Sequence, residues 1–315
     1  MASARDGALR FLALSAAVSA LLACPAWAAK WDIVPTLSVG EIYTDNLSLS
    51  PDTSKRSDWV TQVIPGISIS AIGAASRFNV SYTPELIYYA QGEADNKVFH
   101  RLNAFGNAEL AKQLLFVDAG AFVGPEYISL LAPLSLSSFN TTGNVATVGK
   151  YYVSPFLRRD FGSAVHAEAR YTYSVVNSDD PSRVPNSVAD RVDLRLNSGP
   201  AYKLLVWNIE YRKESINYEN QQDIDIEVTS ANARRLITPT IGLLARVGYE
   251  YYRTGIVEPA SEGSFWGAGL DWTPTPRTRL AAGAGHRLRP ATTAAGGAAR
   301  RGSCVARTAP PGRSA

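Results

Sequence analysis

Apolar and polar residues alternate along most of this chain with the two-residue period of a β-strand. The segment SRFNVSYTPELIYYA, residues 76–90, shows the pattern clearly. Phe78, Val80 and Leu86 fall on one parity, whereas Arg77 and Glu85 fall on the other. Such a strand has one apolar face and one polar face. The chain therefore raises the question of whether protein or lipid covers the apolar faces.

The alternation recurs from Trp31 to about residue 286, and a helical period is hard to find for more than a turn or two. The pattern predicts an all-β chain. The predicted strands are 32–43, 58–71, 77–90, 99–110, 114–124, 145–158, 164–175, 190–198, 204–216, 226–234, 241–252, 264–273 and 277–286.

The connections between these strands alternate in length. Short connections are predicted at 73–75, 111–113, 159–162, 199–203, 236–240 and 273–276, and long polar ones at 44–57, 91–98, 125–144, 176–189, 217–225 and 253–263. A soluble sandwich has no reason to keep its long loops at one end. Outer-membrane barrels do so, because short turns face the periplasm and longer loops face outside.

The apolar faces are rich in Ala, Tyr and Trp, as in Trp59 to Ile69, Val165 to Tyr173, Leu205 to Tyr211 and Trp266 to Trp272. Aromatic residues gather toward the predicted strand ends, where a lipid–water interface favours them. They are Tyr88-Tyr89, Tyr151-Tyr152, Tyr249 to Tyr252, Trp266 and Trp272. The alternative interpretation is that these aromatic residues fill the core of a sandwich. Slipping strand 77–90 by one residue would turn Arg77 and Glu85 toward the apolar side, so lipid would strongly specify the register.

These observations favour a transmembrane antiparallel up-and-down β-barrel of about 14 strands, since a sheet in lipid must close to leave no unpaired edge. Its polar face would line the interior. The lumen-facing candidates are Arg77, Glu85, Arg101, Glu109, Asp118, Lys150, His166, Glu168, Arg170, Arg191, Asp193, Arg195, Glu210, Arg212, Arg246 and Glu250. Both signs of charge are present in near balance, which suggests either a weakly selective polar pore or a charge-paired plug.

Residues 1–28 are predicted to be a signal peptide. Arg5 and Arg10 precede an apolar run, and Ala26-Trp27-Ala28 supplies a small-residue cleavage site. A competing interpretation uses Leu21-Leu22-Ala23-Cys24, which resembles a lipobox and would attach a lipid to Cys24. No later segment approaches the roughly 20 apolar residues of a transmembrane helix.

The net charge of +3 in 315 residues is unevenly distributed. The signal segment contributes two Arg and one Asp and residues 288–315 contribute five Arg, so the body between them carries −3. No basic stripe with interleaved aromatic residues is present, so nucleic acid is not an expected partner.

Three motifs carry a family resemblance: Trp31-Asp32-Ile33-Val34-Pro35, Tyr43-Thr44-Asp45-Asn46-Leu47 and Val63-Ile64-Pro65-Gly66-Ile67-Ser68. Residues 31–90, and the strand at Arg246-Val247-Gly248-Tyr249-Glu250, resemble the outer-membrane β-barrel proteins associated with PEP-CTERM/exosortase protein-sorting systems, which are encoded near exopolysaccharide loci. The resemblance implies a porin-like barrel serving envelope or exopolysaccharide traffic. It brings no catalytic residue, and Tyr43, Thr44, Asp45 and Asn46 form its motif loop.

Residues 287–315 depart from this pattern. The tail is rich in Ala, Arg, Gly and Pro and has no acidic or aromatic residue. Two interpretations stay open: a disordered extension, or a reading frame shifted near residue 287 that has replaced a final strand. An odd count of thirteen predicted strands favours the second, because bacterial single-chain barrels have even counts.

Two groups of polar residues could have either a chemical or a structural role. His166 beside Glu168 and Arg170 fits a network of charges better than an acid–base centre, because no nucleophile can be matched to it. Asp223, Asp225 and Glu227 share one face and could hold calcium, although an acidic strand rim is the simpler interpretation.

The sequence therefore predicts a single barrel over residues 29–286 in the outer membrane of a Gram-negative cell. It is expected to be porin-like and non-enzymatic, with no cofactor and no metal. The expected partners are outer-membrane lipid and either polysaccharide or sorted proteins. The alternative is a lipidated surface or periplasmic β-protein that binds envelope polysaccharide.

Overall fold

A computed structural model of the chain describes residues 29–131, 137–139, 141, 143–255, 257–275, 278–288 and 307–308. Nearly all of these residues are β-strand, and the only helix among them is a 3₁₀ turn at Asp52–Ser54. No helix in this part of the chain is long and apolar enough to cross a membrane. The predicted signal peptide, Cys24 and most of the tail lie outside the described residues.

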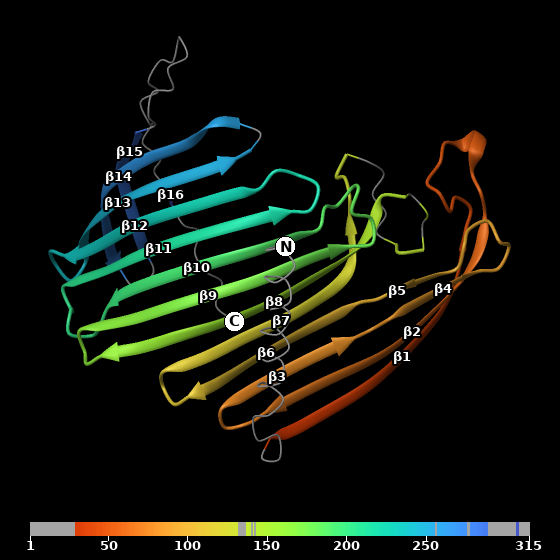
Figure 1. Ribbon diagram of the computed structural model, residues 1–315, viewed down its shortest axis with the longest axis horizontal. Helices are drawn as coiled ribbons and strands as arrows, with labels where there is room; N and C mark the ends of the chain where they lie inside the picture. The colour runs from red at the N-terminus through yellow and green to blue at the C-terminus, as the bar shows by residue number, and fades with distance from the viewer. Residues whose placement is uncertain are drawn as a thin grey trace, which may run out of the picture. The chain divides into compact units, whose positions relative to one another are not determined.

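The strands follow one another up and down through a single sheet, with antiparallel ladders wherever the register is known (Figure 1). From β6 onward each strand pairs with the next one along the chain. This confirms the predicted all-β class and its up-and-down order. The strands are β1 Lys30–Thr44, β2 Asp58–Ile72, β3 Ser76–Tyr82, β4 Glu85–Tyr89, β5 Lys97–Phe99, β6 Leu102–Ala111, β7 Leu115–Tyr127, β8 Val145–Phe161, β9 Val165–Ser178, β10 Ser187–Ser198, β11 Leu205–Tyr218, β12 Ile224–Leu236, β13 Ile241–Thr254, β14 Val257–Thr275, β15 Thr278–Leu288 and β16 Arg307–Thr308.

Strands β3 and β4 are two halves of one interrupted strand. On β2, Ile67 pairs with Tyr82 of β3, and four residues earlier Val63 pairs with Leu86 of β4, so the register does not change across the break. Strands β5 and β6 continue each other in the same way. Pro84 lies at the first interruption, and a proline has no N–H to donate to a ladder. The two predicted strands 77–90 and 99–110 are therefore each present with one local break.

The connections largely follow the predicted alternation. The short ones join β2 to β3, β6 to β7, β8 to β9, β10 to β11, β12 to β13 and β14 to β15. Hydrogen bonds link several of the longer loops, because Thr141 donates to the Leu47 carbonyl, Arg183 to the Gly143 carbonyl and Asn186 to Glu219. The predicted loop 253–263 is wrong. Strand β14 already begins at Val257, where small and polar residues pair with the aromatic end of β13.

Close packing along the chain divides it into two compact units. Unit 1 comprises the residues through Pro155 together with Tyr173–Val188 and Tyr218–Gln221. Unit 2 comprises Phe156–Thr172, Ala189–Asn217 and the chain from Gln222 onward. Several strands contribute to both units.

In unit 2 the register aligns apolar side chains in rows across four strands. Ile209 of β11 lies opposite Ala231, which lies opposite Val247, which lies opposite Trp266 of β14. Val247 and Trp266 expose 56% and 54% of their surface, and Ile209 is also exposed. This row belongs to the apolar face that the alternation predicts, and nothing in the described part of unit 2 covers it.

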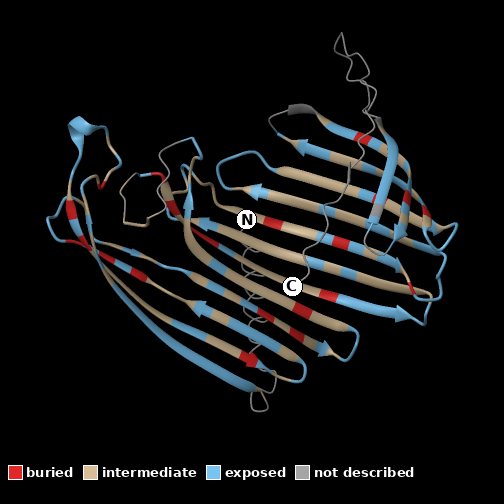
Figure 2. Cartoon of the chain, turned by 180° about the vertical axis from the view of Figure 1, so that it is seen from behind, coloured by how far each residue is buried: buried red, intermediate tan, exposed pale blue. Residues whose placement is uncertain are grey.

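Unit 1 has the same arrangement. Its apolar face carries Leu37, Val39, Trp59 and Tyr88, which are 69%, 65%, 47% and 56% exposed. The cluster of buried hydrophobic residues in the described chain lies on the other, polar side of the sheet. It contains Leu47, Val60, Ile87 and Tyr89. Figure 2 shows buried positions as isolated bands along the strands rather than as one core.

The distribution of burial is the reverse of that in a soluble sandwich, in which the apolar faces would pack on each other. Leaving a Val, Leu, Ile or Phe side chain in water forfeits about 1.5–3 kcal/mol. The aromatic prediction needs two corrections. Tyr89, Tyr152 and Tyr252 lie on the polar side of the sheet. Trp266 also lies near the middle of β14 instead of near its start, because that strand begins seven residues before its predicted first residue.

A matched pair of substitutions tests which medium covers the apolar face. Val247→Arg places a charge at the centre of that face, and Val228→Arg places the same charge on the polar face of the neighbouring strand. If hydrocarbon covers the apolar face, Val247→Arg should lower the free energy of unfolding in lipid vesicles by about 2–4 kcal/mol. Val228→Arg should change it by less than about 1 kcal/mol. Equal effects in urea titrations of the two variants would contradict the lipid assignment.

Candidate functional site

The register and side-chain contacts place all sixteen predicted lumen residues on the polar face of their strands. In unit 1 these are Arg77, Glu85, Arg101, Glu109, Asp118 and Lys150. In unit 2 they are His166, Glu168, Arg170, Arg191, Asp193, Arg195, Glu210, Arg212, Arg246 and Glu250.

Glu168 of β9 is held by arginines from three strands. Arg158 Nη2 of β8 lies 3.0 Å from Glu168 Oε2, and Arg170 Nε of β9 lies 3.2 Å from Oε1. Arg195 Nη1 of β10 approaches Oε1 to 3.5 Å. Antiparallel pairing of neighbouring strands brings these positions together, because same-face residues on adjacent strands lie opposite one another.

Asp193 of β10 forms the second centre of the group. Its side chain is buried, with Arg191 Nε at 2.6 Å from Oδ2 and Arg212 Nε at 2.8 Å from Oδ1. Burying a carboxylate without such partners would be strongly unfavourable. The two guanidinium groups therefore fix the orientation of the Asp193 carboxylate.

The ring of Phe156 contacts two of these arginines. The guanidinium carbon of Arg170 lies 3.7 Å from the Phe156 ring centroid, and that of Arg158 lies 5.2 Å from it. The aromatic ring can thus stabilise both cations through its π face. We name Arg158, Arg170, Arg191, Arg195 and Arg212, with Glu168 and Asp193, the arginine cluster. Five cations against two anions give it a formal excess of +3, although the polar face as a whole has near balance.

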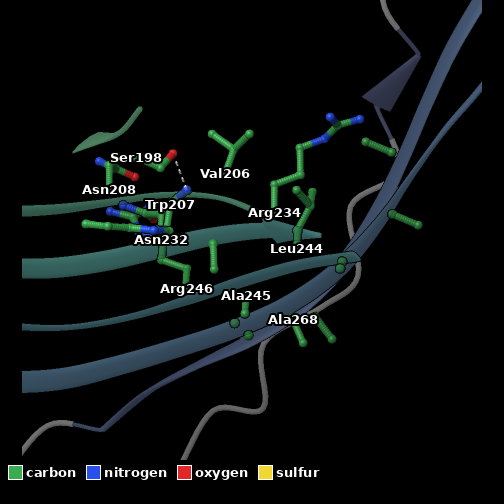
Figure 3. A pocket seen from close by; sticks show the side chains of 18 of the residues that line it. Ser198, Val206, Trp207, Asn208, Asn232, Arg234, Leu244, Ala245, Arg246 and Ala268 are labelled. Atoms are coloured by element: carbon green, nitrogen blue, oxygen red, sulfur yellow. Dashed lines mark hydrogen bonds between the residues drawn. The ribbon is translucent and has the colours of Figure 1, made fainter. Parts of the chain in front are cut away.

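A cavity of about 870 Å³ lies on unit 2 between β10 and β15. Figure 3 shows Asn208, Asn232 and Arg246 close together at one side of it, with Arg234 farther along. Glycines of β14 and β15 form part of its lining.

Arg234 borders this cavity and pairs with the fully buried Asp271. Arg234 Nε lies 3.2 Å from both carboxylate oxygens, and Nη2 lies 2.6 Å from Oδ2. The pair lies over Gly242, where an added Cβ would come within 2.3 Å of Asp271 Oδ1. A glycine is therefore required at residue 242 for the carboxylate to occupy its position.

In unit 1, part of the loop between β7 and β8 lies on the polar face. Ser138 donates to the buried Glu85, which also binds Arg101 at 3.1 Å and accepts from Gln62 at 3.0 Å. The hydroxyl of Tyr89 donates to the Phe139 carbonyl at 2.6 Å. This loop segment thus covers the polar side of β2 and β4.

Several of the remaining predicted residues have structural partners. His166 Nδ1 lies 2.5 Å from Asp160 Oδ1, and Lys150 Nζ lies 2.6 Å from Glu126. In the motif loop, Tyr43 packs on Trp59 with ring centroids 5.2 Å apart. The Asn46 side chain accepts from Ser50 N and donates to Ser50 O, and Asn46 N donates to the Thr44 hydroxyl, so Asp45 lies within a closed turn.

Sequence reasoning missed Phe156, Arg234, Asp271 and Ser138. Arg234 and Asp271 share the parity of the neighbouring polar positions, so a comparison of facing strands could have found them. Phe156 looked like an apolar residue in a strand, and Ser138 belongs to a long loop. Neither residue carries a sequence signal for its contacts. Asp225 pairs with Arg253 and accepts from Ser215, as expected for an acidic strand rim.

No protein-family profile and no curated protein sequence matches the chain. Among solved structures, it is similar to a loop-deletion form of OmpT, an outer membrane protein of Vibrio cholerae, with TM-score 0.37, 11% identity and coverage of 84% of this chain and 95% of that chain. It is also similar to the anion-selective porin from Comamonas acidovorans, with TM-score 0.36, 8% identity and coverage of 83% of this chain and 89% of that chain. Salmonella typhi OmpF matches with TM-score 0.38, 10% identity and coverage of 84% of this chain and 92% of that chain. Similarity at this level leaves the assignment of function to the residues of this chain.

The Arg234–Asp271 pair predicts an asymmetry between two deletions. Arg234→Ala removes the guanidinium that pairs with the buried Asp271, and removing one partner of a buried pair costs about 3–5 kcal/mol. Asp271→Ala leaves Arg234, which is 34% exposed and can reach water, so its cost should be closer to 1 kcal/mol. Urea unfolding of both variants in vesicles measures the difference. Equal destabilisation would show that the carboxylate is not buried as described.

Proposed function

We propose that this chain is an outer-membrane β-barrel of a Gram-negative cell whose polar face lines an aqueous passage. The apolar face meets hydrocarbon, and the sheet closes on itself in the membrane. The passage carries polar solutes and performs no chemical reaction on them.

The observation that carries this proposal is the opposition of the two faces in unit 2. One face presents exposed Val, Leu and Trp side chains, and the other presents the arginine cluster. Water solvates the second face well and the first one badly, whereas hydrocarbon does the reverse. A closed barrel satisfies both faces and leaves no backbone edge in lipid.

The strand number is compatible with a lumen. Counting each interrupted pair as one strand gives thirteen strands from β1 to β15, near the predicted 14. Barrels of eight strands are filled by side chains and those of sixteen to eighteen hold open channels, so this size is intermediate. The loop segment at Ser138 and Phe139 covers polar surface in unit 1, and in this proposal it narrows the passage.

The arginine cluster gives the passage a preference for anions. Its local excess of guanidinium groups creates a positive potential even though the polar face is nearly neutral in total, because charge acts over about a Debye length, roughly 8–10 Å. The solute in this proposal is an envelope or exopolysaccharide chain, and the link to PEP-CTERM protein sorting rests on the motif residues between 31 and 90.

Planar-bilayer recording on purified protein tests the passage. We expect discrete conductance steps and, across a KCl gradient, a reversal potential that shows anion preference. Arg195→Gln should reduce that preference, because it removes one positive charge from the arginine cluster. Arg195 is chosen because it makes the two longest ion pairs of the cluster, so its loss should disturb the fold least. Arg159→Gln is the matched control, since it removes the same charge from the opposite face.

A silent bilayer from correctly folded protein would contradict the passage. Equal reversal potentials for the Arg195→Gln and Arg159→Gln variants would contradict the role of the arginine cluster. Heat-modifiable migration on gels establishes that each variant is folded before recording.

A further inference from the structure

One cross-strand row of the polar face in unit 2 has a composition unlike its neighbours. Asn208 of β11 lies opposite Asn232 of β12, which lies opposite Arg246 of β13. Arg246 lies opposite Gly267 of β14, which lies opposite Gly285 of β15. All five residues line the 870 Å³ cavity, and Figure 3 shows the two amides and the guanidinium grouped together.

Arg246 is held in a way that leaves its donors available. Its guanidinium carbon lies 4.7 Å from the centroid of the Phe265 ring. A contact of this kind with an aromatic ring does not use the N–H groups as hydrogen-bond donors, so they can still donate to a ligand. Arg234 and the five arginines of the cluster each pair with a carboxylate, whereas no ion pair joins Arg246 to a carboxylate among the described residues.

The two amides supply a different kind of group. A carboxamide offers both a carbonyl acceptor and an NH₂ donor, and it carries no charge. Asn208 Nδ2 donates to Glu210 Oε1 at 3.0 Å, which orients the amide along the strand face. Asn197 of β10 lines the same cavity. Donors and acceptors are therefore available beside the cation.

The glycines explain why there is room for a ligand. At Gly267 and Gly285 the polar face has no side chain, and a Cβ added at Gly267 would meet no atom closer than 3.5 Å. Side chains are thus absent where the row ends, and the cavity volume falls within the roughly 300–1,000 Å³ of small-molecule sites.

We propose that this row is a binding site for a sugar unit that carries a carboxylate, such as a uronate within a polysaccharide chain. The Arg246 guanidinium receives the carboxylate in its fork of donors. Asn208 and Asn232 exchange hydrogen bonds with the ring hydroxyls, and the ring lies over Gly267 and Gly285. This inference rests on the proposed function, because it assigns the solute of that passage.

The composition of the row distinguishes this ligand from simpler ones. A small inorganic anion binds mainly as a hydrogen-bond acceptor, so the amide carbonyl oxygens would contribute little to its binding. A neutral sugar would satisfy the amides but would leave the guanidinium without an anion. Only a ligand with both hydroxyl groups and a negative charge matches all three side chains.

The probes for the test are hexagalacturonate, neutral maltohexaose and sodium phosphate. Binding of fluorescently labelled oligosaccharides to the full chain folded in detergent micelles is measured by anisotropy, and block of the bilayer current is recorded in parallel. We expect hexagalacturonate to bind at least tenfold more tightly than maltohexaose. Phosphate should compete only at far higher concentration.

Two variants locate the binding. Arg246→Gln and Gly267→Leu should each weaken hexagalacturonate binding about tenfold or more. The first removes the cation, and the second places a side chain in the part of the cavity that the sugar ring would occupy. Arg77→Gln is the matched control, because it removes an exposed arginine from the polar face of unit 1 and should leave affinity unchanged.

The outcomes separate this inference from the proposed function. If the bilayer conducts but hexagalacturonate neither binds nor blocks, the proposed binding site is contradicted and the proposed passage is supported. If hexagalacturonate binds through Arg246 while the bilayer stays silent, the binding site is supported and the passage is contradicted. Binding that Arg77→Gln weakens as much as Arg246→Gln, or equal affinity for the neutral hexamer, overturns the assignment of the ligand to this row.

Discussion

The medium that contacts the apolar face of the sheet determines how the other parts of this chain are organised. Side chains such as Leu37, Val247 and Trp266 are half exposed or more, and the described chain has no second layer that covers them. Water would leave many such side chains unburied at about 1.5–3 kcal/mol each. Hydrocarbon removes that cost and simultaneously excludes charge from the same face.

The arrangement of charges follows from this constraint. Charged side chains are restricted mostly to the polar face, where neighbouring strands bring them within hydrogen-bond distance. Asp193 and Asp271 are buried there. Asp193 is held by Arg191 of its own strand and Arg212 of the adjacent strand, and Asp271 is held by Arg234 from two strands away. Glycines at 242, 267 and 285 set how closely side chains and backbone approach one another. The same face therefore provides both the strongest local interactions and the space for a solute.

Much of this arrangement follows from the alternation in the sequence. Strand positions, the two faces and the parity of all sixteen candidate residues depend on a period of two, which is a local property. The contacts of those residues are different. That Arg212 reaches Asp193, or that Arg234 reaches Asp271 across β13, depends on which strands are neighbours and on their register. The start of β14 at Val257 was missed because Ala260 to Gly263 has loop-like composition, and pairing with Tyr251 and Tyr252 overrides it. The Ser138 contact to Glu85 joins a loop to a distant strand, for which alternation gives no signal.

Fluorescence quenching of the tryptophans reports which medium contacts the apolar face. The five tryptophans of the described chain, Trp31, Trp59, Trp207, Trp266 and Trp272, all lie on the apolar face. In vesicles of lipids brominated on the acyl chains, we expect strong quenching of their emission, with little additional quenching by aqueous acrylamide. Emission that acrylamide quenches efficiently and brominated chains leave unchanged would show that water covers this face, and it would exclude contact with hydrocarbon.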